Sequence, residues 1–396
     1  MTHEICLNEY EIRAKKVQEM MKHQGVDGLL IASEVNLLYL TGKIFMGAVY
    51  IPSEGSIIKF IRRPLSLSSD ASFGGYVIRK IEQIRELLAE QVVSPKRNAK
   101  IGLELGELPY SEITRQQNIF DSDDFIDATA LMRQVRMVKT NKEIEEIKLI
   151  ANIHVSLMQK IPAIYRKGMT DRDFQIEIER EMRKMGSIGI FRSFGITMNI
   201  FMGSVLTGDN ADAPSPYDFA LGGAGMCALP IGANGSEIKK GQSVMIDMAG
   251  NFGSYITDIT RTYSLGKLPQ QAYELHELSR TMHREIMQKA RPGVSCADIY
   301  NMSLERVQKT GAQDFFMGHT QRAQFVGHGF GLHINEMPVL TGRSKDVLQP
   351  GMTIAYEPKF VIPGVGAVGV ENSYLITDKG VELLTELNEE IIDIDK

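Results

Sequence analysis

The chain has 396 residues, of which 43% are hydrophobic and 23% are charged, and its formal net charge is −5. These values indicate an ordinary globular protein of two or three domains, and the lack of a basic patch argues against nucleic acid as a partner. The start of the chain lacks the apolar run of a signal peptide, no segment is apolar for long enough to cross a membrane, and three widely spaced cysteines suit a reducing compartment. We therefore expect a cytoplasmic protein.

The first third of the chain alternates helical and extended patterns. Helices are predicted at 8–24, 35–40, 81–90 and 109–120, and strands at 27–32, 48–51, 56–61 and 100–105. This alternation is typical of an α/β domain, which we place at 1–130. No glycine-rich phosphate loop of the strand–GxGxxG–helix kind occurs here, so a nucleotide site has no support.

The rest of the chain opens with a clear helix start. Thr140 and Glu143 have the spacing of a capping box, and apolar residues follow at helical spacing through Ile161. His154 lies on that apolar face, and we interpret it as a core histidine rather than a ligand. Further helices are predicted from Thr170 to about Gly186, at 269–290 and at 296–310. Four long helices with glycine-punctuated strands predict an α+β domain at 131–396.

Two aspartates in the segment 243–263 suggest a metal site. The segment reads as two strands, and if Phe252 and Gly253 form a two-residue turn, Asp247 lies directly opposite Asp258 on one face. Carboxylates opposed among apolar residues are unfavourable unless a cation lies between them or one stays protonated. Solvated surface carboxylates are the alternative, which the β-branched and apolar neighbours make the weaker interpretation.

The same arrangement recurs near the C-terminus. Glu357 and Glu371 lie equally far from Gly364, so a simple hairpin opposes them, although a bulge at Gly366 would shift the register by one. His328 lies between two glycines and could be a turn residue, but beside four carboxylates it becomes a fifth ligand. Mostly oxygen ligands and one imidazole suit Mn, Fe, Co or Zn, and bridging carboxylates suggest two ions that share a hydroxide.

These five residues, in this order, resemble the ligand set of the pita-bread metallopeptidase family. The family includes methionine aminopeptidase, aminopeptidase P, Xaa-Pro dipeptidase and creatinase. The resemblance rests on the eleven-residue step from Asp247 to Asp258, the Gly-His-Gly at 327–329, the Ile-Ala-Tyr-Glu-Pro at 354–358 and the Gly-Val-Glu-Asn at 369–372. Residues 8–53 resemble the creatinase/prolidase N-terminal domain, so the match spans nearly the whole chain. A C-terminal pita-bread domain after a smaller α/β domain is the fold this implies.

The resemblance also implies roles for the five residues. Asp247 would chelate one ion, Asp258 and Glu371 would bridge both, and His328 and Glu357 would complete the other. A hydroxide that bridges the ions would attack an amide carbon, with Glu357 as the proton shuttle. Because all five ligands are retained, creatinase itself, which works without this metal set, is a poor match. A homodimer is implied as well.

Two positions depart from the peptidase pattern. Ser215 stands where these peptidases carry a histidine in a Pro-His segment, and Asn335 stands where they carry a second histidine. His333 lies two residues before Asn335 and, on a strand, would share its face, so it is a candidate catalytic replacement. A core or solvated histidine is the alternative. Ser215, Asn335 and His333 are thus the expected substrate contacts.

Three functions therefore stay open. The first is an Xaa-Pro dipeptidase-like or aminopeptidase-like hydrolase that acts on small peptides. The second is a relative that cleaves a non-peptide C–N bond, in a cyclic amidine or small amide, or that acts as a lyase. The third is a catalytically silent binding protein. Carboxylates within 212–218 favour a cationic or amidine-like substrate.

Overall fold

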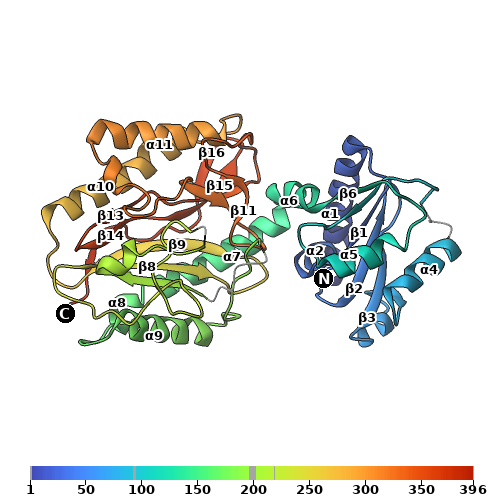
Figure 1. Cartoon of the computed structure of the whole chain (residues 1–396), viewed down its shortest axis with the longest axis horizontal. Helices are drawn as coiled ribbons and strands as arrows, with labels where there is room; N and C mark the ends of the chain where they lie inside the picture. Colours follow the sequence, from blue (N-terminus) through green and yellow to red (C-terminus); the bar gives the residue numbers. More distant parts are fainter. Residues whose placement is uncertain (1, 92–94, 196–201, 218, 396) are drawn as a thin grey trace. The chain divides into compact units, whose positions relative to one another are not determined.

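The structure is a computed structural model that describes residues 2–91, 95–195, 202–217 and 219–395. The chain forms two compact units, Met1–Arg136 and Met137–Lys396 (Figure 1). We expected the boundary at 130/131, near the start of the helix α6 (Thr129–Met137), whereas the units divide near the end of that helix.

The first unit is built on one mixed sheet with the strand order β4-β3-β2-β1-β5-β6. Its strands are β1 (Gly28–Ile31), β2 (Met46–Pro52), β3 (Ile58–Arg63), β4 (Tyr76–Val77), β5 (Ile101–Leu103) and β6 (Phe125–Asp127). Its helices are α1 (Thr2–Gln24), α2 (Glu34–Thr41), α3 (Ser66–Ser69), α4 (Ile84–Glu90) and α5 (Tyr110–Gln117), and the short turn η1 (Ile81–Gln83) leads into α4. The predicted α/β alternation is confirmed.

The second unit contains three sheets among its described residues. One has the order β17-β9-β8-β7, a second β11-β10-β12-β15-β16, and a third pairs β13 with β14. The strands are β7 (Gly203–Thr207), β8 (Ser243–Gly250), β9 (Thr257–Ser264), β10 (Gly327–Gly329), β11 (Glu336–Val339), β12 (Thr353–Tyr356), β13 (Lys359–Ile362), β14 (Gly366–Gly369), β15 (Asn372–Thr377), β16 (Gly380–Leu383) and β17 (Ile392–Asp393). The helices are α7 (Asn141–Met158), α8 (Ile161–Ile164), α9 (Asp171–Lys184), α10 (Gln270–Met287) and α11 (Cys296–Thr310), with short turns η2 (Gly208–Asp212) and η3 (Gln313–Phe315).

Two apolar cores hold the sheets of this unit between the helices. Buried residues of α10 and α11 pack on strands β12 to β15 in one core, and those of α7 and α9 pack on β7, β8 and β9 in the other. Figure 1 shows α10 and α11 on one side of the strands and α8 and α9 on the opposite side. The layers agree with the predicted α+β domain of four long helices against antiparallel sheet.

The predicted starts of α7 and α9 are confirmed. The Thr140 hydroxyl accepts the Glu143 N–H at 3.2 Å, and the Glu143 carboxylate accepts the Thr140 N–H at 2.8 Å, which completes the capping box. Thr170 caps α9 in the same way. His154 is fully buried on α7, as expected of a core histidine. Within the described residues, none of the helices is long and apolar enough to span a membrane.

Three buried histidines predict that acid destabilises the second unit. Burial lowers the pKa of His154 to about 3, of His276 to about 4 and of His283 to about 3. Unfolded histidines take up protons near pH 6.5, so the stability contributed by these groups is complete above that pH and is lost as the pH falls toward the folded values. We expect a loss of about 1 kcal/mol per histidine at pH 5.5, measured by urea denaturation at pH 7.5 and 5.5.

His154 offers the control for this prediction. Its Nδ1 lies 3.0 Å from the Thr257 hydroxyl, while its buried Nε2 has no hydrogen-bond partner among the described residues. A proton added at Nε2 would be buried without an acceptor, so His154→Gln should reduce the slope of stability against pH. An equal loss of stability between pH 7.5 and 5.5 in the wild-type protein and in His154→Gln would contradict the prediction.

Candidate metal centre

The strands β8 and β9 carry the two aspartates, in a register that differs from the predicted one. Asp247 pairs with Thr260, and Asp258 pairs with Ala249, so the aspartates are diagonal rather than directly opposite. The prediction of a two-residue turn was wrong, because residues 251–256 form a longer loop that is tied to other parts of the unit. The shift is two residues, which preserves the strand alternation, and both aspartates remain on one face.

The C-terminal hairpin has the predicted centre at Gly364. Lys359 pairs with Gly369, and the same register continued by two residues would oppose Glu357 to Glu371. Both glutamates lie just beyond the paired strands, and Glu371 instead forms a bridge with Thr260 of β9. This bridge brings the C-terminal hairpin against the aspartate strands.

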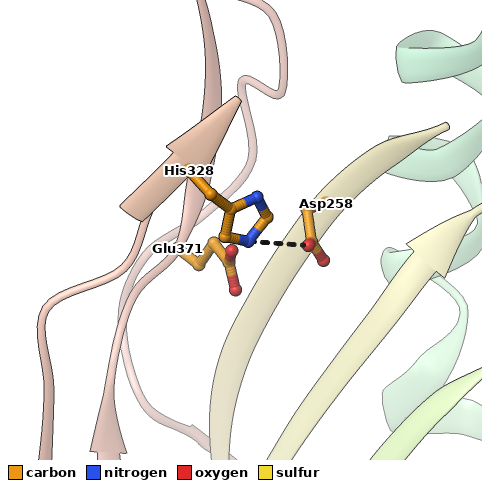
Figure 2. A group of neighbouring side chains, drawn as sticks. All are labelled: Asp258, His328 and Glu371. Carbon is orange, nitrogen blue, oxygen red and sulfur yellow. Dashed lines mark ion pairs between the residues drawn. The ribbon is translucent and has the colours of Figure 1, made fainter. Parts of the chain in front are cut away.

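Five predicted ligands come together where these strands meet. Ligand atoms of Asp258, His328 and Glu371 lie within 4.8 Å of one another, and so do those of Asp247, Glu357 and Glu371. Figure 2 shows the first group, in which His328 Nε2 faces Asp258 Oδ2 at 3.8 Å. The same ring nitrogen lies 3.6 Å from Glu357 Oε1. Glu371, Glu357 and Asp258 are buried, while the Asp247 side chain is 25% exposed.

A lysine that the sequence analysis did not single out lies within the second group. Lys359 Nζ donates to Asp247 Oδ2 at 2.9 Å, to Glu357 Oε2 at 2.7 Å and to Glu371 Oε2 at 3.1 Å. Its side chain is fully buried. The signal was present in the sequence, because Lys359 follows Glu357 by two residues and so shares its face on an extended segment. It is also the one charged residue in the otherwise apolar strand β13.

Burial and mutual repulsion set the protonation of the cluster. Burial, together with the charges of the other carboxylates, raises the pKa of Asp258 well above its usual value and that of Glu371 to about 7, against the opposing effect of Lys359. Burial also raises the pKa of Glu357, opposed by Lys359. Burial alone would lower the pKa of Lys359, but its three carboxylate neighbours outweigh that effect and raise it. Three carboxylates at hydrogen-bond distance from Nζ thus favour the ammonium form of Lys359.

The two groups differ in how well they fit a divalent ion. In the group of Asp258, His328 and Glu371, the buried Oε1 of Glu371 has no hydrogen-bond partner among the described residues, and an imidazole joins two carboxylates. Buried carboxylate oxygens need a partner, and this donor set suits Mn, Fe, Co or Zn. The group of Asp247, Glu357 and Glu371 already surrounds the Lys359 ammonium, so it does not fit an ion in the same position.

The three expected substrate contacts lie in loops rather than on strands. His333 and Asn335 fall in a bend at 331–335, so the inference that they share a strand face was wrong. The Asn335 side-chain oxygen accepts from the Ser193 hydroxyl at 2.8 Å and from the Phe194 N–H at 2.7 Å. The His333 ring is buried and lies edge-on to Phe194.

Ser215 is engaged in a similar way. Its hydroxyl donates to the carbonyl of Pro230 at 2.8 Å and accepts the N–H of Tyr217 at 3.3 Å. The residue is buried. Ser215 thus holds its own loop together, and its role as a substrate contact stays a prediction.

Comparisons with known proteins agree with the geometry. The family model of metallopeptidase family M24 matches residues 145–378, and that of the creatinase/prolidase N-terminal domain matches residues 13–138. The chain is 25% identical over 384 residues to an Xaa-Pro dipeptidase of Pyrococcus furiosus, covering 96% of this chain and 99% of that protein. It is 24% identical to the uncharacterized peptidase YqhT of Bacillus subtilis, with coverage of 96% and 99%.

Solved structures give the same picture of the fold. An Xaa-Pro dipeptidase from Bacillus anthracis superposes with a TM-score of 0.80 at 23% identity, covering 97% of this chain and 99% of that one. The predicted fold, a pita-bread domain after a creatinase-type domain, is confirmed. Because the family model covers more than half of its residues, the chain belongs to metallopeptidase family M24, a family of metal-dependent hydrolases.

Proposed function

We propose that this chain is a metal-dependent hydrolase that cleaves an amide-type C–N bond in a small molecule, with Xaa-Pro peptides as the first substrate class to test. One observation carries the proposal, namely the convergence of Asp258, His328 and Glu371 beside a buried glutamate, Glu357. Family membership and similarity to Xaa-Pro dipeptidases support it. A silent binding protein would have no reason to retain these ligands.

Metal binding and proton transfer are assigned to different residues of the site. Asp258, His328 and Glu371 would hold a divalent ion, which supplies Lewis acidity toward a carbonyl and makes water more acidic. Glu357 Oε1 faces the same group at 3.6 Å from His328 Nε2. We infer that this carboxylate takes the proton of the attacking water and passes it to the leaving amine. Burial raises the pKa of Glu357, which makes its carboxylate a stronger base toward that proton.

A second candidate is a hydrolase for a non-peptide C–N bond, such as that of a cyclic amidine or a small amide. The hydrogen bonds of Asn335 and Ser215 favour it, because the Asn335 side chain is already bonded to Ser193 and Phe194, and the Ser215 hydroxyl to the carbonyl of Pro230. In family peptidases, histidines at these positions contact the substrate carbonyl and the tetrahedral intermediate. Neither residue carries the charge of an imidazolium, and loss of one preorganised donor commonly costs ~100- to 1,000-fold in turnover.

We therefore expect slow turnover of ordinary Xaa-Pro dipeptides. Steady-state kinetics on Ala-Pro, Leu-Pro and Met-Pro with Mn or Co should give kcat/KM below roughly 10⁴ M⁻¹s⁻¹. A parallel screen of small amides and amidines should include a faster substrate if the second candidate is right. Turnover of any of the dipeptides above that limit would restore the plain Xaa-Pro peptidase assignment.

Three finer expectations remain predictions. The sequence predicts two divalent ions, of which the second would lie in the group of Asp247, Glu357 and Glu371, where the structure has the Lys359 ammonium. It also predicts a homodimer and a cytoplasmic protein. The ligand set is compatible with Mn, Co, Fe or Zn and does not select among them.

A further inference from the structure

We infer that the ammonium of Lys359 permanently takes the place of one of the two metal ions, so that this chain binds a single divalent ion. The inference rests on the proposed function only in that it assumes a metal-binding site. It concerns the number of ions and can be tested without a substrate.

The first step of the argument is geometric. Nζ of Lys359 lies 2.7–3.1 Å from three oxygens, Oδ2 of Asp247, Oε2 of Glu357 and Oε2 of Glu371. A transition-metal ion would approach these oxygens to about 2.0–2.2 Å, which requires the same central position. An ion and the ammonium cannot be there together, because their volumes overlap and their charges repel.

The second step is that Lys359 is anchored along its length. Its backbone pairs with Gly369, and its carbonyl accepts the Met317 N–H at 2.8 Å. A Cβ added at Gly369 would lie 3.0 Å from Lys359 Cα and 3.4 Å from Lys359 Cγ, so the lysine stem packs directly over this glycine. The side chain is fully buried and all three of its donors are used.

The third step concerns the other group. Asp258 and His328 have no contact with Lys359 within hydrogen-bond distance among the described residues, and Glu371 reaches Lys359 through Oε2 alone. Its Oε1, buried and without a partner among these residues, stays available to an ion beside Asp258 and His328. Glu371 can therefore bridge between an ammonium and one metal ion, in the way that the resemblance predicted it to bridge between two metals.

The consequence is a site of mixed cations. Lys359 supplies the positive charge that Asp247 and Glu357 need, and it fixes the Oε2 side of Glu357 while Oε1 faces the metal ligands. Lys359 is thus a positioning residue for Glu357 and a substitute for one ion. Unlike an ion, it cannot be removed by a chelator.

Metal content after loading with excess Mn or Co, followed by desalting, tests the inference. Wild-type protein should retain about one ion per chain, and Lys359→Ala, which opens the position, should retain about two. Lys359→Met fills the same volume without charge and should not gain an ion. Lys139→Ala is the matched control, because Lys139 is also a buried lysine paired with a carboxylate, that of Glu336, and its loss should leave the number of ions unchanged.

Two further readouts separate metal binding from loosening of the fold. Metal-free Lys359→Ala should unfold at a lower temperature than wild type, because its carboxylates lose their cation, and Mn should restore more of its stability than it adds to wild type. At full loading, the Mn spectrum in electron paramagnetic resonance should be that of isolated ions in wild type and of coupled pairs in Lys359→Ala. If the variant folds only with metal present, it can be refolded in Mn and its content measured.

The outcomes are distinguishable. Two ions in wild type, or a folded Lys359→Ala that still binds one, would overturn this inference and leave the proposed function intact. Wild-type protein that binds no ion would overturn both. One ion in wild type and two in Lys359→Ala would support the inference even if no substrate had been found.

Discussion

Glu357→Gln is expected to reduce kcat about 10²- to 10⁴-fold on the best substrate of the dipeptide, amide and amidine screen. Glutamine preserves the size of the side chain and can still accept a hydrogen bond from Lys359, which now lies 2.7 Å from Glu357 Oε2. It cannot take up a proton from water or deliver one to the leaving amine. The effect should therefore fall mainly on kcat rather than on KM.

Metal content decides what such a loss means, because Glu357 also lies beside the metal ligands. If Glu357→Gln retains its ion and excess Mn does not restore activity, the lost function is proton transfer. If the ion is lost and excess Mn restores the rate, Glu357 acts chiefly as a ligand. Glu382→Gln is the matched control, since Glu382 pairs with Lys148 at the surface of the same unit and its replacement should change kcat less than twofold. Activity of Glu357→Gln within tenfold of wild type would rule out the proposed role.

The parts of the fold that depend on neighbouring residues could be predicted from the sequence. The capping box of Thr140 and Glu143 joins residues three apart, and Gly42, at a φ of 70°, ends α2 where its left-handed conformation is needed. The C-terminal hairpin also has its centre at the predicted glycine, Gly364. Caps and turns of this kind are determined by residues close together in the sequence, so they do not depend on how distant segments pack.

The features that the sequence did not predict depend on contacts between distant segments. The loop at 251–256 is longer than predicted because Asn251 donates to the carbonyl of Ile190, and the Ile256 N–H donates to that of Gly331. The length of this loop sets the register of β8 and β9. The residues next to the loop do not determine its length, because the contacts that fix it are with distant segments. The opposed carboxylates were predicted to need a cation or a retained proton, and for Asp247, Glu357 and Glu371 the cation in the structure is a side chain of this chain, Lys359.

The largest loss of stability is expected when the buried ion pair of Lys139 and Glu336 is broken. Lys139 Nζ lies 3.0 Å from Glu336 Oε2, and both side chains are almost completely buried. Glu336 Oε1 also accepts the N–H groups of Leu332 and His333, each at 3.2 Å. The chain approaches the pair closely at Gly331, where an added Cβ would lie 2.6 Å from Glu336 Oε2. The pair thus fixes the segment that carries His333.

Glu336→Ala should therefore destabilise the protein by about 3–5 kcal/mol, because it leaves the Lys139 ammonium buried without its carboxylate. For a unit of this size the unfolding temperature should fall by roughly 10 °C. Urea denaturation of the metal-free and the metal-loaded protein measures the loss in both states.

The double variant Lys139→Met/Glu336→Leu separates the effect of the buried charge from that of the lost hydrogen bonds. Replacing both charges by apolar side chains of similar volume should recover part of the loss, but not all, since the Leu332 and His333 N–H groups still lack their acceptor. A double variant no more stable than Glu336→Ala would show that the unpaired charge is not the cause.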